Sequence, residues 1–139
     1  MFQLFNAIDK TKDYRLKNKR IWIILGGVSG FTGIALGAFG AHGLKSILSP
    51  EMLEIYKTGV LYHLIHSIVI FSIGISGRDK FFKASIFFLL GIILFSFSLY
   101  TYSLTDTKFF AIITPFGGVS FLIGWLLVII EGIKIKSDN

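Results

Sequence analysis

The chain has 139 residues, of which 53% are hydrophobic, and a mean hydropathy of +0.73. So much apolar surface excludes an ordinary soluble domain and predicts a membrane protein. The formal net charge of +6 does not indicate nucleic-acid binding, because the lysines and arginines stand in short blocks between apolar runs. The absence of cysteine excludes disulfides, thiol catalysis and Cys-containing metal sites.

Residues 1–20 form a basic cytoplasmic or interfacial tail in this interpretation, separate from the rest of the chain. Six lysines and arginines fall between Lys10 and Arg20, opposed only by Asp9 and Asp13. A basic flank of this kind holds an N-terminus in the cytoplasm. Docking of a partner or of anionic lipid is the alternative interpretation.

Four uncharged runs follow, and each has the roughly 20 residues that a spanning helix needs. The second helix is expected to start earlier than its uncharged run, at residue 50, because Ser49-Pro50-Glu51 is a helix-start signal. The fourth helix begins either near Phe109 or at Pro115, since proline suits a first turn or produces a kink. The expected helices are about 21–41, 50–77, 84–105 and 109–130.

These helices predict an all-α fold: a polytopic membrane protein with a bundle of four transmembrane helices at residues 21–132. A short cytoplasmic tail at residues 133–139 follows. The basic residues divide eleven to three between the two faces of the membrane, with both termini on the richer face. The positive-inside rule therefore places both termini in the cytoplasm.

A face of small residues is the most regular feature of the first run. Its five glycines are spaced by 4, 3, 4 and 3 residues, so they share one side of a helix. The fourth run carries a second such face at Gly117, Ser120 and Gly124. Small residues allow helices in lipid to approach closely, so we expect these faces to pack helices within the chain, between copies, or against another membrane protein. The five glycines are Gly26, Gly30, Gly33, Gly37 and Gly40.

Polar side chains gather on one face of the second helix, and His42 ends the first helix on the same side of the membrane. The three histidines could therefore converge in the outer half of the bundle. We favour interhelical hydrogen bonding by neutral histidines. A metal or proton site is the alternative, because imidazole binds zinc or copper and titrates near neutral pH. The candidate polar cluster comprises His42, Tyr56, Tyr62, His63, His66 and Ser67.

No nucleophile and base stand in a catalytic arrangement, and every acidic residue lies at a helix end or in a loop. We therefore expect a non-enzymatic membrane component, without a cofactor, that is assembled through its glycine-rich helix faces. The lipid bilayer is its expected environment, and a homo-oligomer or a membrane-protein partner is possible. The alternative function is a binding or transport site for a small solute, protons or a metal ion, built around His42 and His66.

Four blocks of the sequence resemble a known family. They are GAFGAHGLK (37–45), TGVLYHLIH (58–66), LFSFSLY (94–100) and TPFGGVSFLIGW (114–125). In this order they resemble the signature blocks of the YgdD/YwdK-type small membrane proteins, a family of unknown function with bacterial inner-membrane members and small eukaryotic relatives.

The resemblance covers about residues 21–132 and implies four transmembrane helices in a bacterial cytoplasmic membrane. His42, Tyr62 and His66 match positions that the family pattern favours. His63 stands where the pattern is loose, and Phe97 stands where it usually has glycine, so a close backbone approach is not implied at Phe97.

Overall fold

The computed structural model describes residues 2–135, with the side chains of residue 13 and residues 16–135. Over residues 2–135 every regular element is helical, which confirms the predicted all-α class. Several consecutive helical segments form one stretch at Asp79–Thr105, here called the third helix. In chain order the elements are α1 (Phe2–Phe39), a π-helical turn (Gly40–Leu44), α2 (Pro50–Ser76), a 3-10 turn (Asp79–Phe81), α3 (Phe82–Gly91), a second π-helical turn (Ile92–Ser96), α4 (Phe97–Thr105) and α5 (Lys108–Ile133).

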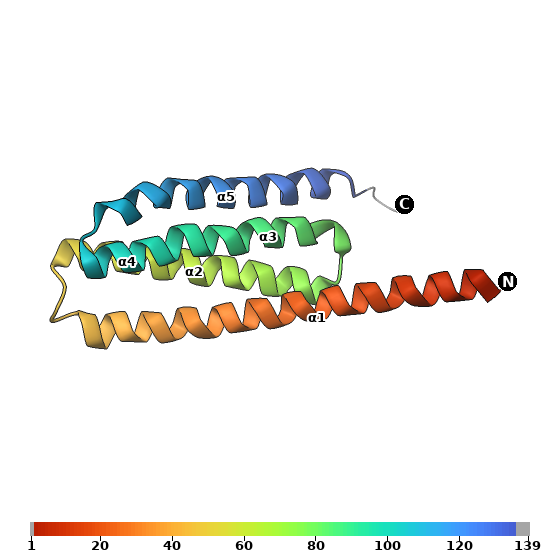
Figure 1. The fold of residues 1–139 in the computed structure, drawn as a ribbon, viewed down its shortest axis with the longest axis horizontal. Helices are drawn as coiled ribbons and strands as arrows, with labels where there is room; N and C mark the ends of the chain where they lie inside the picture. The colour runs from red at the N-terminus through yellow and green to blue at the C-terminus, as the bar shows by residue number, and fades with distance from the viewer. Residues whose placement is uncertain (1, 136–139) are drawn as a thin grey trace.

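Four helical stretches in the described residues are long and apolar enough to cross a membrane. They run up and down, so that the two ends of the chain lie at the same end of the molecule (Figure 1). The four stretches are Leu16–Leu44, Pro50–Ser76, Asp79–Thr105 and Lys108–Ile133. The protein is therefore a polytopic, four-span membrane protein, as the sequence predicts.

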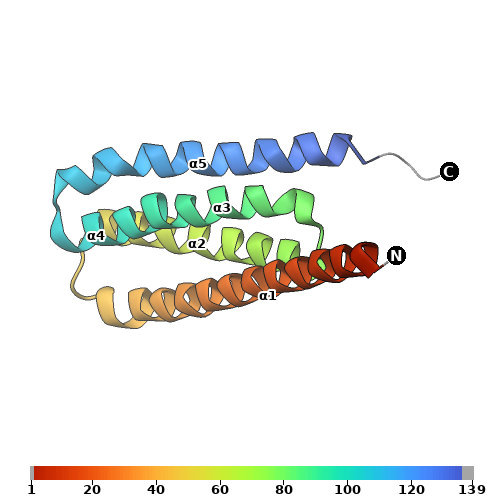
Figure 2. The same ribbon diagram turned by 45° about the vertical axis from the view of Figure 1, so that its right-hand side comes forward.

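The helices pack as a row in chain order. The α1 helix packs mainly on α2, α2 also packs on the third helix, and the third helix packs on α5. Figures 1 and 2 show α1 and α5 on opposite outer sides, with α2 and the third helix between them. Each outer helix thus has one main neighbour and exposes most of its circumference.

The first helix is longer than expected. Residues 2–20 continue into the spanning segment without a break, as part of one helix. The physical reason is that no glycine or proline occurs between Phe2 and Leu25, so nothing interrupts the helix. The position of residues 2–20 in the cytoplasm or at the membrane interface stays a prediction. The expected cytoplasmic tail at residues 133–139 falls mostly outside the described residues.

The second helix begins at Pro50, where the start signal lies. The Ser49 hydroxyl accepts a hydrogen bond from the Met52 backbone N–H at 3.2 Å, and so caps the first turn. The helix stops at Gly77, whose φ of +62° is the left-handed conformation that glycine adopts readily.

The fourth spanning helix resolves the alternative that the sequence left open. α5 begins at Lys108, after Asp106 in the left-handed conformation, and Pro115 lies inside it. Thr114, the residue before this proline, bonds both within α5 and to α4. Its hydroxyl donates to the carbonyl of Phe110 at 3.1 Å and contacts the Ser98 hydroxyl at 2.8 Å.

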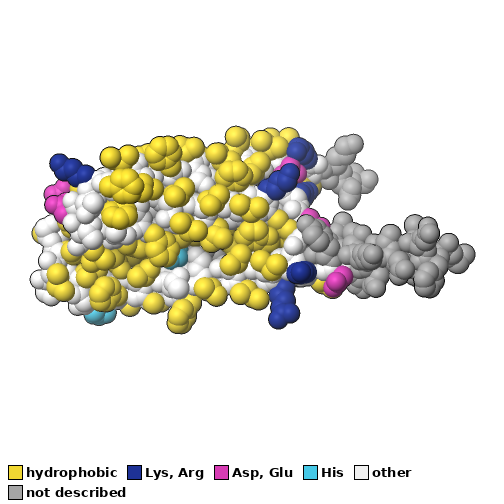
Figure 3. Space-filling model, in the orientation of Figure 1, with side chains coloured by type: hydrophobic (Ala, Val, Ile, Leu, Met, Phe, Trp, Pro, Cys, Tyr) yellow, Lys and Arg dark blue, Asp and Glu magenta, His cyan; other side chains and the backbone are white. Residues whose placement is uncertain are grey.

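Large buried side chains come mainly from the two central helices. Between residues 16 and 39, α1 buries only glycine and Ser29, and it points its large apolar side chains outward. Figure 3 shows the resulting apolar surface along the length of the bundle, with charged side chains near its ends. The large side chains of the core are Leu44, Tyr56, Ile70, Ile73, Phe82, Phe88, Ile92, Tyr100 and Phe121.

Candidate functional site

A buried hydrogen-bond network joins α1, α2 and α4 around His63, whose side chain is 1% exposed. The Nε2 atom of His63 lies 3.1 Å from the Ser29 hydroxyl, and its Nδ1 lies 3.2 Å from the Tyr100 hydroxyl. The Ser29 hydroxyl also contacts the Ser67 hydroxyl at 2.6 Å. One imidazole therefore connects three helices.

The direction of each bond in this network follows from counting hydrogens. Ser67 donates its one hydroxyl hydrogen to the carbonyl of His63 at 2.7 Å, so Ser29 must be the donor to Ser67. Ser29 then has no hydrogen left, and the Nε2–H of His63 donates to it. In a neutral imidazole Nδ1 is then the acceptor, and the Tyr100 O–H donates to it. The network thus satisfies His63 as a neutral ring.

His66 lies one turn further along α2 and faces a different set of neighbours. Its Nδ1–H donates to the Tyr62 carbonyl at 2.8 Å, and its Nε2 accepts from the Trp125 indole N–H at 3.3 Å. Its ring stacks on that of Phe121, with centroids 3.6 Å apart and planes at 9°. His66 is 4% exposed, and this environment also suits a neutral ring.

The two buried imidazoles have no free lone pair for a metal. Each neutral ring has one unprotonated nitrogen, and in both rings that nitrogen already accepts a hydrogen bond, from Tyr100 in one case and from Trp125 in the other. Across the described residues, no group of three histidines, cysteines or acids is placed to hold a metal ion.

His42 does not join the other two histidines. It is exposed on the π-helical turn that ends α1, and this turn lies beside Tyr56 at the start of α2. His66 is ten residues further along α2, about 15 Å along the helix axis. The expected convergence of three histidines is therefore not found, because His63 and His66 face different neighbours and His42 lies near the end of the bundle opposite the termini.

The remaining members of the predicted cluster serve the packing of α2. The buried Tyr56 donates its hydroxyl to the Leu36 carbonyl at 2.9 Å and contacts the ring of Tyr100, with centroids 4.9 Å apart. Tyr62 is partly exposed and packs on the rings of Phe95 and Phe121.

The cluster predicted from sequence lacks three residues that bond to the buried histidines: Ser29, Tyr100 and Trp125. Ser29 lies three residues after Gly26 and four before Gly33, so its position on the glycine face was a usable signal. Trp125 gave no such signal, because its contact with His66 joins residues 59 positions apart.

The glycines of α1 lie against α2, and those of α5 lie against the third helix. A methyl group at Gly26 would be 2.6 Å from the Phe71 backbone nitrogen, and one at Gly33 would be 2.8 Å from the Leu64 side chain. At Gly117 a methyl group would overlap the backbone of Phe95, and at Gly124 it would be 2.6 Å from the ring of Phe88. The two glycine faces therefore have different partners and do not meet each other.

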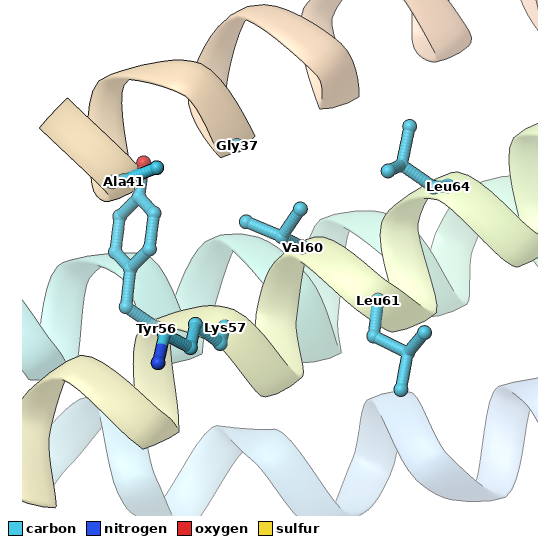
Figure 4. Close-up of a pocket in the computed structure, with 8 residues that line it drawn as sticks. Gly37, Ala41, Tyr56, Lys57, Val60, Leu61 and Leu64 are labelled. Atoms are coloured by element: carbon cyan, nitrogen blue, oxygen red, sulfur yellow. The ribbon is translucent and has the colours of Figure 1, made fainter.

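The other three glycines of the predicted face are Gly30 and Gly37 in α1 and Gly40 in the π-helical turn that follows, and each faces a side chain of α2. A methyl group at Gly30 would lie 4.0 Å from the Ser67 Cβ, and one at Gly37 would lie 3.1 Å from Val60. At Gly40 it would meet the ring of Tyr56. The contacts at Gly37 and Gly40 border an apolar groove of about 240 Å³, shown in Figure 4. Its lining residues are Gly37, Gly40, Ala41, Tyr56, Lys57, Val60, Leu61 and Leu64.

Comparison with known proteins places the chain in a family. Residues 36–118 match the family described as "Protein of unknown function (DUF423)". The chain belongs to this family. The membrane protein YwdK of Bacillus subtilis is 37% identical over 120 residues, which cover 83% of this chain and 98% of the relative.

Two further relatives extend this similarity. The inner membrane protein YgdD of Escherichia coli is 37% identical over 84% of this chain and 92% of its own length. A UPF0382 membrane protein of Haemophilus influenzae is 42% identical over 88% of this chain and 99% of its own length. No solved structure matches the chain. The resemblance seen in the four sequence blocks is thereby confirmed, and the DUF423 family remains one of unknown function.

Proposed function

We propose that this DUF423 protein is a non-enzymatic component of the bacterial cytoplasmic membrane, with both termini in the cytoplasm. Its glycine faces close its own bundle, so that its outer surface is left to lipid. The observation that carries the proposal is the full engagement of both buried histidines, which leaves neither of them free as a base or a ligand.

The contacts of the glycine faces support an assembly role inside the chain. Gly26 approaches the backbone of α2, and Gly117 approaches the backbone of the third helix. The opposite sides of the outer helices carry large apolar side chains, such as Phe31 at 75% exposure and Phe116 at 66%. Surfaces of this kind suit acyl chains, whereas close helix association in lipid favours small residues.

The charge distribution supports the orientation. The cations Lys17, Lys19 and Arg20 of α1 share the end of the molecule that carries the termini with the loop between Gly77 and Lys83. The opposite end carries three lysines, Lys45, Lys57 and Lys108, and no arginine among the described residues. Both termini therefore face the cytoplasm under the positive-inside rule.

A disulfide between α1 and α2 tests where the glycine face packs. A methyl group at Gly30 would lie 4.0 Å from the Ser67 Cβ, within the range of a disulfide. Because the chain has no native cysteine, Gly30→Cys with Ser67→Cys gives a clean readout in membranes. We expect an intramolecular disulfide, seen as protection from a maleimide label with no dimer on a non-reducing gel. A disulfide-linked dimer would overturn packing within the chain.

Metal analysis tests the chemical part of the proposal. The purified protein, His42→Ala and His66→Ala should all lack a stoichiometric metal ion. One equivalent of zinc or copper that disappears in His66→Ala would contradict the proposal and restore the histidine-based alternative.

A further inference from the structure

An apolar groove of about 300 Å³ lies between α2 and α5, toward the end of the molecule that carries the termini. Arg78 stands at its polar end, immediately after α2. The groove is separate from the histidine networks and from the groove of Figure 4. Its other lining residues are Ile68, Val69, Ser72, Ile73, Ser76, Phe81 and Val128.

The length of the groove matches one leaflet of a bilayer. From Ile68 to Ser76 the helix rises about 12 Å, and the hydrocarbon of one leaflet is about 15 Å deep. Five of the eight lining residues are aliphatic or aromatic, so the groove offers a mainly apolar surface. An acyl chain is the ligand that can fill such a groove from the side.

Cations surround the polar end of this groove. The exposed Arg78 takes part in no ion pair within the described residues, where the pairs are Lys57–Glu54 and Lys134–Glu131. The Lys80 ammonium lies 5.6 Å from the centroid of Phe81, whose ring lines the groove. Even with Asp79 counted, the loop from Gly77 to Lys83 carries three cations and one acid.

The groove between α1 and α2 gives an internal contrast. It is also apolar, and Lys57 stands among its lining residues. There, however, the ammonium pairs with Glu54 at 2.6 Å. That cation is already compensated, whereas Arg78 and Lys80 form no ion pair among the described residues.

We propose that the α2–α5 groove binds an acyl chain of an anionic phospholipid, whose phosphate lies against Arg78 and Lys80. Clusters of basic residues beside membrane-spanning helices attract anionic headgroups in this way. The proposal goes beyond the proposed function, because it assigns a specific lipid site to a surface that a purely structural component would not need.

Native mass spectrometry of the detergent-purified protein tests the headgroup. The probes are phosphatidylglycerol and phosphatidylcholine with identical acyl chains, and the readout is the dissociation constant of the first bound lipid. We expect the wild type to prefer phosphatidylglycerol. Arg78→Gln should weaken its binding about fivefold, which corresponds to about 1 kcal/mol per cation, and Arg78→Gln with Lys80→Gln about 25-fold. Lys57→Gln is the matched control and should change neither constant.

A second variant tests the acyl-chain part. Ser72→Phe places a ring in the groove at an exposed position, so it should weaken both lipids while the helical circular dichroism stays unchanged. Equal affinity of the wild type for the two lipids would overturn the proposal. So would an unchanged phosphatidylglycerol affinity in the Arg78/Lys80 double variant, or an equal loss in Lys57→Gln. The disulfide between α1 and α2 reads out the proposed function independently of these results.

Discussion

The α1–α2 contact and the contact between α5 and the third helix both hold two helices close together, but they use different side chains. Both rest on glycines that let helices approach closely. Across the first contact, Ser29 of α1 bonds to His63 and Ser67 of α2. Across the second, Gly124 receives the ring of Phe88, and Phe121 lies against Gly91.

This difference shows which forces remain available when lipid replaces water. Burial of apolar side chains gains little in a bilayer, because lipid tails are equally apolar. Close packing of glycine against backbone is therefore common to both contacts. The first adds a buried network of hydrogen bonds between side chains. The second adds edge-on aromatic pairs, such as Phe95 with Phe121, whose ring centroids lie 5.6 Å apart at 62°, beside two separate hydrogen bonds from Thr114 and Ser120.

The largest expected effect is at Gly117. Gly117→Ala forces a methyl group into the backbone around Phe95, which cannot rotate away as a side chain would. Overpacking costs about 1–3 kcal/mol, and we expect the upper end of that range. Unfolding in a denaturing-detergent titration, followed by circular dichroism, measures it. Gly118→Ala is the control, because the Phe95 ring would be 4.0 Å from the new methyl group, an ordinary contact distance. Equal effects of the two variants would contradict the assigned packing.

Gly26→Ala tests the other contact with a matched neighbour. Its methyl group would lie 2.6 Å from the Phe71 nitrogen and 2.7 Å from its Cα, whereas one at Gly27 would meet nothing within 4 Å. We expect a loss of about 2 kcal/mol for Gly26→Ala, because α1 can tilt away from its single main neighbour. Gly27→Ala should be neutral or slightly stabilising, since alanine favours a helix more than glycine does. The same titration measures both, and a comparable loss at Gly27 would show that α1 is rotated.

The hydrogen bonds can be compared by removing one hydroxyl from each contact. Ser29→Ala leaves the Nε2–H of His63 without its acceptor and Ser67 without its donor, so we expect a loss of about 1 kcal/mol. Ser120→Ala removes one bond to the Phe87 carbonyl, with an expected loss of about 0.6 kcal/mol. A double-mutant cycle of Ser29→Ala with Tyr100→Phe should be non-additive, because both bond to His63. Additive losses would argue against a connected network.

Trp125→Phe gives the smallest expected effect. It keeps an aromatic ring beside Phe88 and His66 but removes the indole N–H that lies 3.3 Å from Nε2 of His66. We expect a loss of about 0.6 kcal/mol or less in the same titration. A loss above that of Ser29→Ala would mean that hydrogen bonding matters more at α5 than at α1.

The sequence determined the number and type of spanning helices because hydrophobic length alone decides them. The spacing of the glycines also identified which face of α1 carries small residues and packs closely on a neighbour. It did not identify the neighbour, since periodicity specifies a face of a helix and leaves open what covers it. Gly117 and Gly124 accordingly pack on the third helix, whereas the glycines of α1 pack on α2.

The candidate site was harder to predict for the same reason. His63 and His66 share one sector of α2 by residue spacing, yet their side chains leave the helix toward different neighbours. Ring orientation depends on distant partners such as Tyr100 and Trp125, which no local pattern relates. The position of His42 could not be predicted either, because the charge pattern indicates only a side of the membrane and neither the depth of a side chain nor its direction.

The π-helical turn at Ile92–Ser96 gives the third helix two independent registers. A π-turn closes its hydrogen bond one residue later than an α-turn, which shifts the angular position of everything after it by about 100°. Residues before the turn, such as Phe88, are thereby decoupled from residues after it, such as Tyr100. A single helix can then direct phenylalanine toward α5 at one end and a phenol toward His63 at the other. Removal of one residue from the turn would restore one continuous register and take Tyr100 out of line with His63.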